Sequence, residues 1–210
     1  MSTLEIQLTQ PKVVVFDLGK VLVDFDFTKA ARSLASESNY SVEQMTDLIN
    51  QSPLLHRYET GLISTQEFFE TIRRVSGYRA SFLEFSQRFG DIFSEVRAMT
   101  DLNRYFRKQG LSTFVFSNTS PLAADYIRAN FPFFDEFSDY ILSYEHFSMK
   151  PDQRLYEVVE AKTKVDRNGI LYFDDRYENI ETARNRGWQA VWHQHPEKTL
   201  ADLRLSGLII

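Results

Sequence analysis

The stretch that decides the fold is VVVFDLGKVL, residues 13–22. Four apolar residues, three of them valine, run directly into Asp17 and a turn that contains Gly19. A run this short and this rich in β-branched residues is typical of a strand buried on both faces of a parallel sheet. We therefore expect residues 13–16 to form a central strand, with the Asp17 carboxylate at its carboxyl end.

Four later runs have the same form: Thr113–Phe116 before Ser117, Tyr140–Leu142 before Ser143, Ile170–Phe173 before Asp174, and Ala190–Trp192 before His193. Helical patterns lie between them, at about residues 101–109, from 120 onward, and at about 153–163 and 178–186. Strands that alternate with single helices indicate βαβ units. The predicted fold class is α/β, with a Rossmann-like parallel sheet as its core.

The segment from about residue 27 to 97 departs from this alternation and contains no convincing strand. Three Ser-x-x-Glu/Gln capping boxes mark helix starts there: Ser41 with Gln44, Ser64 with Glu67, and Ser81 with Glu84. No linker rich in Gly, Pro or Ser precedes or follows it, which favours a compact unit over a tether. We expect residues 27–97 to form an inserted α-helical cap, and residues 1–26 and 98–210 to form the α/β core.

The composition narrows the class of protein further. Hydrophobic residues make up 43% of the 210 residues and charged residues 25%, as in an ordinary globular domain. The net charge of −5 gives no basic surface for nucleic acid, and the lack of cysteine removes thiol chemistry. No signal-peptide pattern and no apolar run of about 18 residues is present, so we expect a cytoplasmic protein without a membrane partner. The oligomeric state stays open.

Polar residues follow the predicted strands, where ligands bind in open parallel sheets. Asp17, Ser117-Asn118 and Asp174-Asp175 stand at strand ends, and Lys150 lies in a loop beyond the strand at 140–142. Neighbouring carboxylates repel one another unless a cation lies among them, and hard oxygen ligands suit Mg²⁺. A hydroxyl, an amide and an ammonium are the donors that a phosphoryl group requires. The set predicts a Mg²⁺ site that faces a phosphate site, with one carboxylate free to attack phosphorus.

At these residues the sequence resembles the haloacid-dehalogenase-like (HAD) superfamily of phosphohydrolases. VVVFDLGKVL (13–22), FVFSNTS (114–120), MKPD (149–152) and LYFDDRYENI (171–180) are similar to its four motifs. The segment YETGLIS (58–64) resembles caps of the subgroup that holds bacterial sugar-phosphate (glucose-1-phosphate-type) phosphatases and the phosphatase domain of soluble epoxide hydrolase. The combination of motifs is far more specific than any one of them.

The resemblance implies a role for each acidic residue. Asp17 would be the nucleophile that forms a phosphoaspartyl intermediate. Its carboxylate, the Gly19 carbonyl and Asp175 would bind Mg²⁺, and Asp174 would support the metal through water or a hydrogen bond. The expected enzyme is a phosphoric monoester hydrolase.

The resemblance also implies which residues hold the phosphoryl group. Ser117 and Asn118 would bind its oxygens. Lys150 would neutralise charge on the nucleophile and on the transferring group, and Asn179 would support the site from behind. Catalysis would rest mainly on positioning and electrostatics.

Gly19 departs from the family pattern, because most phosphatases of the superfamily have an aspartate there that protonates the leaving oxygen. General acid–base assistance contributes roughly 10²–10⁴-fold. Its loss matters least when the leaving alcohol is acidic, which favours a sugar 1-phosphate, or another substrate with a good leaving group, over a simple phosphomonoester. Asp24 and Asp26, near the entry into the cap, are candidates to replace the missing acid.

We therefore expect a Mg²⁺-dependent phosphatase for a small phosphorylated metabolite, with a sugar phosphate favoured. A haloacid dehalogenase on the same fold is one alternative, although the Asp174-Asp175 pair argues against a metal-free reaction. A catalytically weak member that binds a phosphorylated ligand is another, supported by Gly19. His193 and His195 alternate at strand spacing and form a weaker candidate for a metal pair, without a third ligand in sight.

Overall fold

The computed structural model describes residues 8–210. Five parallel strands form one sheet in the order β5-β4-β1-β6-β7. They are β1 (Val13–Phe16), β4 (Ser112–Ser117), β5 (Asp139–Leu142), β6 (Ile170–Asp174) and β7 (Gln189–Trp192). Strand β1 lies in the middle, and Val13 pairs with Ser112 of β4 and with Ile170 of β6. The parallel α/β sheet predicted from the sequence is confirmed, with each strand boundary within one residue of its expected place.

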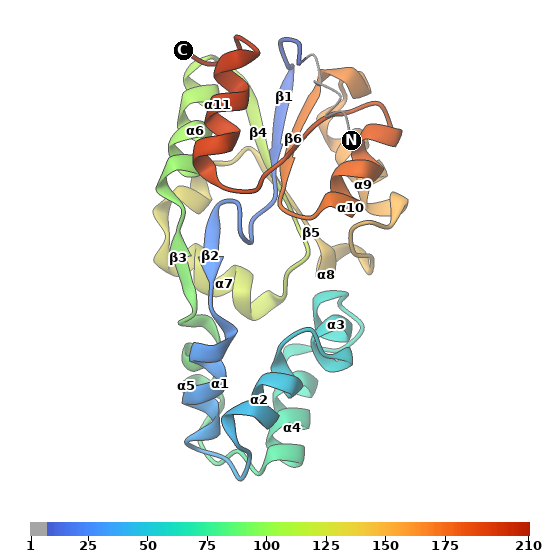
Figure 1. Cartoon of the computed structure of the whole chain (residues 1–210). Helices are drawn as coiled ribbons and strands as arrows, with labels where there is room; N and C mark the ends of the chain where they lie inside the picture. Colours follow the sequence, from blue (N-terminus) through green and yellow to red (C-terminus); the bar gives the residue numbers. More distant parts are fainter. Residues whose placement is uncertain (1–7) are drawn as a thin grey trace, which may run out of the picture.

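Helices cover both faces of this sheet (Figure 1). One face packs against α6 (Arg97–Lys108), α7 (Pro121–Asn130) and α11 (Pro196–Leu205), and the other packs against α9 (Gln153–Thr163) and α10 (Tyr177–Asn185). The alternation along β1 serves both cores: Val14 and Phe16 enter the first, whereas Val13 and Val15 enter the second. This arrangement explains why β1 is apolar at every position.

Helix α6 begins about four residues before its expected start. Its N-cap residue is Val96, which makes no side-chain capping bond, so the sequence carries no capping signal at that point. Shorter elements complete the core: η1 (Pro132–Glu136), α8 (Ser143–His146) and η2 (Arg167–Gly169).

Five helices form a second body below the core (Figure 1). They are α1 (Phe27–Ala35), α2 (Val42–Ile49), α3 (Pro53–Glu59), α4 (Thr65–Ser76) and α5 (Phe82–Gly90). All three expected capping boxes are formed, at the starts of α2, α4 and α5. The interior of this body is aromatic, with the rings of Tyr58 and Phe68 stacked at 4.3 Å and Phe85 and Phe89 beside them.

A two-stranded antiparallel ribbon joins the two bodies, formed by β2 (Val23–Phe25) and β3 (Phe93–Glu95). The expectation that residues 27–97 contain no strand is wrong at β3, whose three residues, Phe-Ser-Glu, are too few for a periodic pattern. Helices α1 to α5 lie inside the segment expected to be the cap. The exact division into 1–26, 27–97 and 98–210 stays a prediction.

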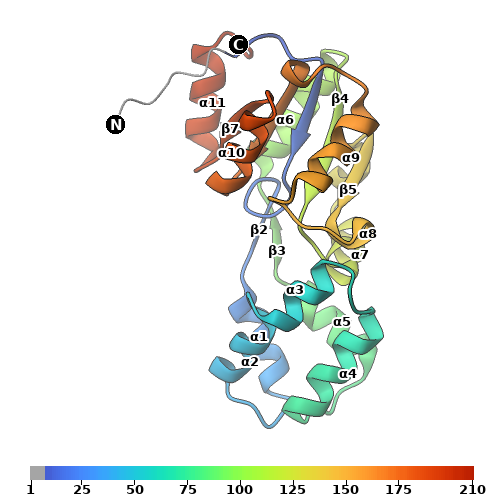
Figure 2. The ribbon, with the colours of Figure 1, turned by 90° about the vertical axis from the view of Figure 1, so that its right-hand side faces the viewer.

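Figure 2 shows that α3 is the helix of the lower body nearest to α8, and the two helices are in contact. The cap therefore faces the carboxyl ends of the strands, where the polar residues lie. Between residues 8 and 210, no helix is both long enough and apolar enough to cross a bilayer.

Candidate active site

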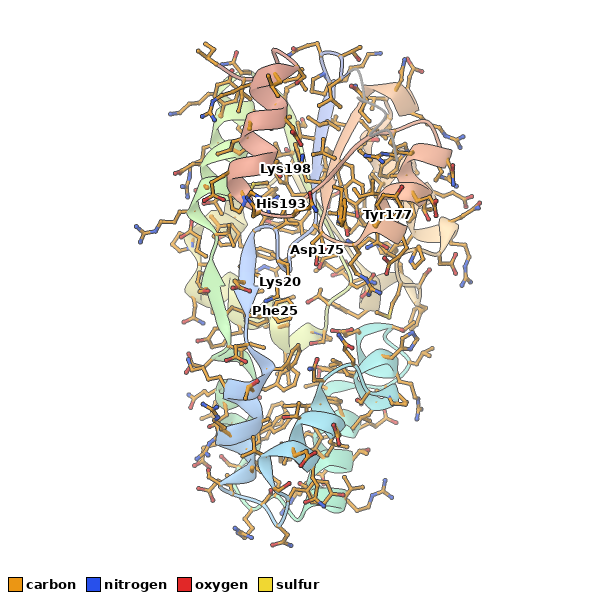
Figure 3. The ribbon with its side chains drawn as sticks, in the orientation of Figure 1. Lys20, Phe25, Asp175, Tyr177, His193 and Lys198 are labelled. Atoms are coloured by element: carbon orange, nitrogen blue, oxygen red, sulfur yellow. The ribbon has the colours of Figure 1, made fainter. Side chains whose placement is uncertain are left out.

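The carboxyl ends of β1 and β6 bring three carboxylates together. Asp17, Asp174 and Asp175 each offer an oxygen, and these oxygens lie within 4.8 Å of one another. Figure 3 places Asp175 at the end of the core that faces the cap, with Lys20 and Phe25 on the cap side of it. The pairing of β1 with β6 is the cause, because parallel neighbours end at the same sheet edge.

Lys150 reaches this cluster from the loop that follows α8. Its Nζ lies 2.9 Å from Oδ1 of Asp17 and 2.6 Å from Oδ2 of Asp174, and it also donates to the Phe116 carbonyl at 2.8 Å. The lysine is only 4% exposed. Burial alone would lower the pKa of Lys150, but Asp17 and Asp174 outweigh burial and raise it, so the ammonium stays charged.

The single ammonium does not balance the three acids. Burial, opposed by Lys150 and reinforced by Asp174 and Asp175, raises the pKa of Asp17 to about 8. Burial and Asp174 also raise the pKa of Asp175. A divalent cation among these oxygens would remove the repulsion, and an all-oxygen donor set is the one that Mg²⁺ prefers. The residues present therefore fit a magnesium ion.

Asp174 is fully buried and surrounded by donors. It accepts hydrogen bonds from the Lys150 ammonium, the Tyr172 hydroxyl and the Arg176 N–H, and from the Asn179 side-chain amide at 3.0 and 3.1 Å. The structure thus places Asn179 against Asp174, and its supporting role in the site stays a prediction. Sequence reasoning missed Tyr172, although its position two residues before Asp174 on one strand places both side chains on the same side of the sheet.

The residues expected to bind the phosphoryl group lie on the same rim. Ser117 ends β4 and is 2% exposed. The Asn118 side chain, in contrast, pairs with the backbone of Lys150, accepting from its N–H at 2.8 Å and donating to its carbonyl at 2.9 Å. Because one side-chain N–H of Asn118 is used in holding the lysine loop, its second side-chain N–H and its backbone N–H are the donors left for a phosphoryl contact.

A small pocket of about 70 Å³ lies between this rim and the cap. The core contributes Gly19 and Ser117 to it, with Leu18, Asn118, Thr119, Ser120, Ala123 and Ile127. The ribbon and cap contribute Val23, Phe25, Phe27, Leu55, Glu59, Phe89, Ile92 and Phe93. Gly19 therefore faces the pocket, and its carbonyl as a metal ligand stays a prediction.

Helix α3 closes over the pocket through a direct contact with the core. The Ser143 hydroxyl, at the start of α8, donates to the Glu59 carbonyl at 2.5 Å and accepts from the Thr119 N–H at 3.0 Å. One buried hydroxyl thus joins the last residue of α3 to the loop that follows Ser117.

The weaker candidates lie away from the pocket. Asp24 forms an exposed pair with Lys20, and Asp26 caps α1 by accepting from the Thr28 N–H at 2.8 Å, so neither lines the pocket. The His193 ring is buried against Thr199, which lowers its pKa to about 4, and His195 caps α11. Among the described residues, the acidic cluster is the only group of three or more His, Cys, Asp or Glu side chains placed to hold a metal ion. It contains neither histidine.

Comparison with known proteins gives a consistent picture. The family profile of the haloacid dehalogenase-like hydrolases matches residues 11–187. A curated relative, D-ribitol-5-phosphate phosphatase of Bacteroides thetaiotaomicron, is 24% identical over 188 residues, which cover 85% of this chain and 89% of the relative. The (S)-2-haloacid dehalogenase of Pseudomonas sp. strain YL is 33% identical over 101 residues, covering 48% of this chain and 42% of that enzyme.

Solved structures show the same fold. A HAD family enzyme from Bacteroides thetaiotaomicron, crystallised with magnesium and inorganic phosphate, superposes with a TM-score of 0.77 at 22% identity. The match covers 86% of this chain and 93% of that one, so both the core and the helical cap are shared.

Proposed function

The chain belongs to the haloacid dehalogenase-like hydrolase family, and we propose that it is a Mg²⁺-dependent phosphatase for a small sugar phosphate or polyol phosphate, acting through a phosphoaspartyl intermediate on Asp17. One observation carries the proposal. The Lys150 ammonium contacts Asp17 at 2.9 Å inside a cluster of three carboxylates, and Ser117 ends β4, the strand that pairs with β1. A nucleophilic carboxylate, cation ligands and donors for a phosphoryl group thus occupy one rim.

The nucleophile is held in place before any substrate arrives. Oδ1 of Asp17 accepts from the Leu18 N–H at 2.7 Å and from the Lys150 ammonium, which fixes the orientation of the carboxylate. Lys150 is in turn fixed by Asp174 and by the Phe116 carbonyl. Such preorganisation lowers the barrier because no dipole has to turn during phosphoryl transfer.

Asp17 and Asp175 would hold the magnesium ion, which supplies positive charge next to the transferring phosphoryl group. Ser117 and the backbone beyond it would bind the phosphoryl oxygens, and Lys150 would offset the charge that remains. Asp174 and Asn179 would hold this arrangement from behind.

Two findings support the substrate class. The curated relative that matches 85% of this chain acts on D-ribitol 5-phosphate. The pocket under the cap, about 70 Å³, is far smaller than the 300–1,000 Å³ of drug-sized sites, which favours a small leaving group.

The test is phosphate release from a panel of sugar and polyol phosphates, with and without Mg²⁺, by the wild type and by Asp17→Asn. Mg²⁺-dependent release that Asp17→Asn abolishes is the expected result. Halide release from 2-haloacids without metal would mean a dehalogenase, and binding without turnover of any substrate would mean a binding protein.

A further inference from the structure

Among the described residues, the pocket wall at Gly19 carries no acidic side chain. Gly19, two residues after Asp17, has no side chain, and a Cβ built there would lie 2.9 Å from Cε1 of Phe25. The Phe25 ring is held by edge-on contacts with Phe27 and Phe93, whose ring centroids lie 5.5 and 6.2 Å away. An aromatic wall therefore takes the space that an acidic side chain at position 19 would need.

Among the residues that the structure describes, Glu59 is the only ionisable one that lines this pocket. It ends α3, so it reaches the pocket from the cap, across from the strand ends that carry the other polar groups. Its backbone carbonyl is fixed by Ser143, whereas its carboxyl group makes no hydrogen bond or ion pair with any residue between 8 and 210. The residue is partly accessible to solvent. The carboxyl group of a residue that lines an otherwise uncharged pocket thus has no hydrogen-bond or ion-pair partner among the described residues.

We propose that Glu59 is the general acid and base of the reaction, supplied by the cap in place of the residue missing at Gly19. This inference rests on the proposed phosphatase function. In the first step Asp17 forms a bond to phosphorus, the ester P–O bond breaks, and the Glu59 carboxyl proton passes to the leaving oxygen. In the second step the Glu59 carboxylate takes a proton from the water that attacks the phosphoaspartyl group. That step releases phosphate and restores both carboxyl groups.

The electrostatics of the pocket suit both steps. Burial raises the pKa of Glu59 to about 7, and Arg176 is the charged group that opposes this rise. An acid that is half protonated near neutral pH can donate a proton in one step and accept one in the next. A carboxyl group placed in an apolar pocket is the usual way in which proteins obtain such a value.

Because Glu59 belongs to the cap, proton transfer by its carboxyl group depends on the docking of the cap on the core. The Ser143–Glu59 contact links the position of the acid to the docking of α3 on the core. When α3 lifts away, Asp17 and Lys150 stay in the core but the acid leaves, so phosphoryl transfer to bulk water is disfavoured until a substrate is enclosed.

The experiment compares Glu59→Gln with the wild type and with Glu70→Gln, a control at an exposed glutamate on α4 of the same cap. Single-turnover and steady-state rates are measured for p-nitrophenyl phosphate and for an alkyl phosphate. The p-nitrophenolate leaves without protonation, whereas an alkoxide needs the acid. Unfolding curves check that the variants are folded, which we expect because the Glu59 side chain bonds to no neighbour among the described residues.

With the alkyl phosphate, Glu59→Gln should slow the first turnover by about 10²–10⁴-fold. With p-nitrophenyl phosphate the first turnover should change less than about tenfold, since little proton transfer is needed. Later turnovers should be slow for both, because the phosphoaspartyl group lacks its base, so the variant should show a burst of p-nitrophenol. Glu70→Gln should behave like the wild type.

Equal slowing of the first turnover with both substrates, or Glu59→Gln rates like those of Glu70→Gln, would overturn the role of Glu59 alone. The proposed function would still stand in either case if release needs Mg²⁺ and Asp17. If the wild type releases no phosphate, or Asp17→Asn keeps its activity, the proposed function fails and the role of Glu59 fails with it.

Discussion

The Tyr58 hydroxyl on α3 accepts a hydrogen bond from the Leu122 N–H, 3.2 Å away, in the first turn of α7. First-turn N–H groups have no partner within their own helix, so the cap satisfies a donor of the core. Tyr58 is fully buried, stacked on Phe68, and its hydroxyl also pairs with Thr65 at 2.9 Å. The hydroxyl thus joins the interior of the cap to the core beside the candidate active site.

Tyr58→Phe should therefore weaken cap closure without disturbing the aromatic packing. The free energy of unfolding should fall because the hydroxyl loses its bond to Thr65 within the cap and its bond to the Leu122 N–H of the core, the latter alone costing about 1 kcal/mol. If the same energy favours the open cap, kcat/KM should fall roughly fivefold. Tyr40→Phe is the control, because no hydrogen bond of its hydroxyl is found among residues 8–210. An unchanged kcat/KM in Tyr58→Phe would show that this contact does not control closure.

The close approach of Phe25 to Gly19 gives a second prediction. Gly19→Ala places a methyl group 2.9 Å from the Phe25 ring, so the ring or the loop must move. Overpacking of this kind costs about 1–3 kcal/mol, which urea unfolding would measure. In a Phe25→Leu background the cost of Gly19→Ala should shrink, because the atom that clashes is gone. Equal costs in both backgrounds would mean that Phe25 is not the obstacle.

Much of the core could be predicted from the sequence because each of its strands has a recognisable local sequence pattern. The runs that end at Phe16, Phe116 and Phe173 are apolar throughout, as only strands buried on both faces are. The capping boxes at Ser41, Ser64 and Ser81 report helix starts through local hydrogen bonds. Strand β3 has neither kind of signal, and it forms only because β2 lies beside it.

The candidate site, too, could be predicted from the sequence only in part. Strand ends could be located from their patterns, so the sequence alone was enough to place Asp17 and Asp174 at one sheet edge. Glu59 could not be placed in this way, because its position over that edge depends on how the cap packs on the core, through contacts such as Ser143 with the Glu59 carbonyl. The partner of the Asn118 side chain could not be predicted for a similar reason, since it is the backbone of Lys150, 32 residues away.

Magnesium should stabilise the folded protein through the acidic cluster. A ligand present at about 100 times its Kd adds about 2.7 kcal/mol, so Mg²⁺ should raise the unfolding temperature measurably. Asp175→Asn should remove most of this increase, because it takes away one carboxylate of the cluster. Glu181→Gln, at an exposed position on α10, is the matched control. If Mg²⁺ stabilises Asp175→Asn as much as the wild type, the ion binds elsewhere.

Lys150 should be essential for folding as well as for catalysis. Lys150→Met leaves Asp17 and Asp174 buried without their counter-ion, and breaking a buried pair of this kind costs about 3–5 kcal/mol. Lys162→Met, which breaks a half-exposed pair with Asp139 at 2.9 Å, should cost no more than about 1 kcal/mol. Urea unfolding without metal compares the two, and similar losses would contradict the buried pair as the source.

The pH dependence of stability tests the environment of Glu59 without any measurement of activity. The pKa of Glu59 is about 7 in the folded protein and about 4.5 when unfolded. Below pH 4.5 the Glu59 carboxyl group is protonated in both the folded and the unfolded state, so its titration does not change the free energy of unfolding. Between pH 4.5 and 7 the folded state holds a proton that the unfolded state has lost, so wild-type stability falls as pH rises, and above pH 7 the penalty is constant.

Glu59→Gln is neutral at every pH and escapes this penalty. Its stability relative to the wild type should therefore rise between pH 4.5 and 7 and then level off. The gain should reach about 1–3 kcal/mol, because one pKa unit corresponds to about 1.4 kcal/mol and partial solvent access reduces the full effect. Urea unfolding at six or so pH values measures the difference, with Glu70→Gln as the matched control. A flat line for Glu59→Gln would mean that the Glu59 carboxyl group of the wild type is solvated. The cap would then contain no acid that is half protonated near neutral pH.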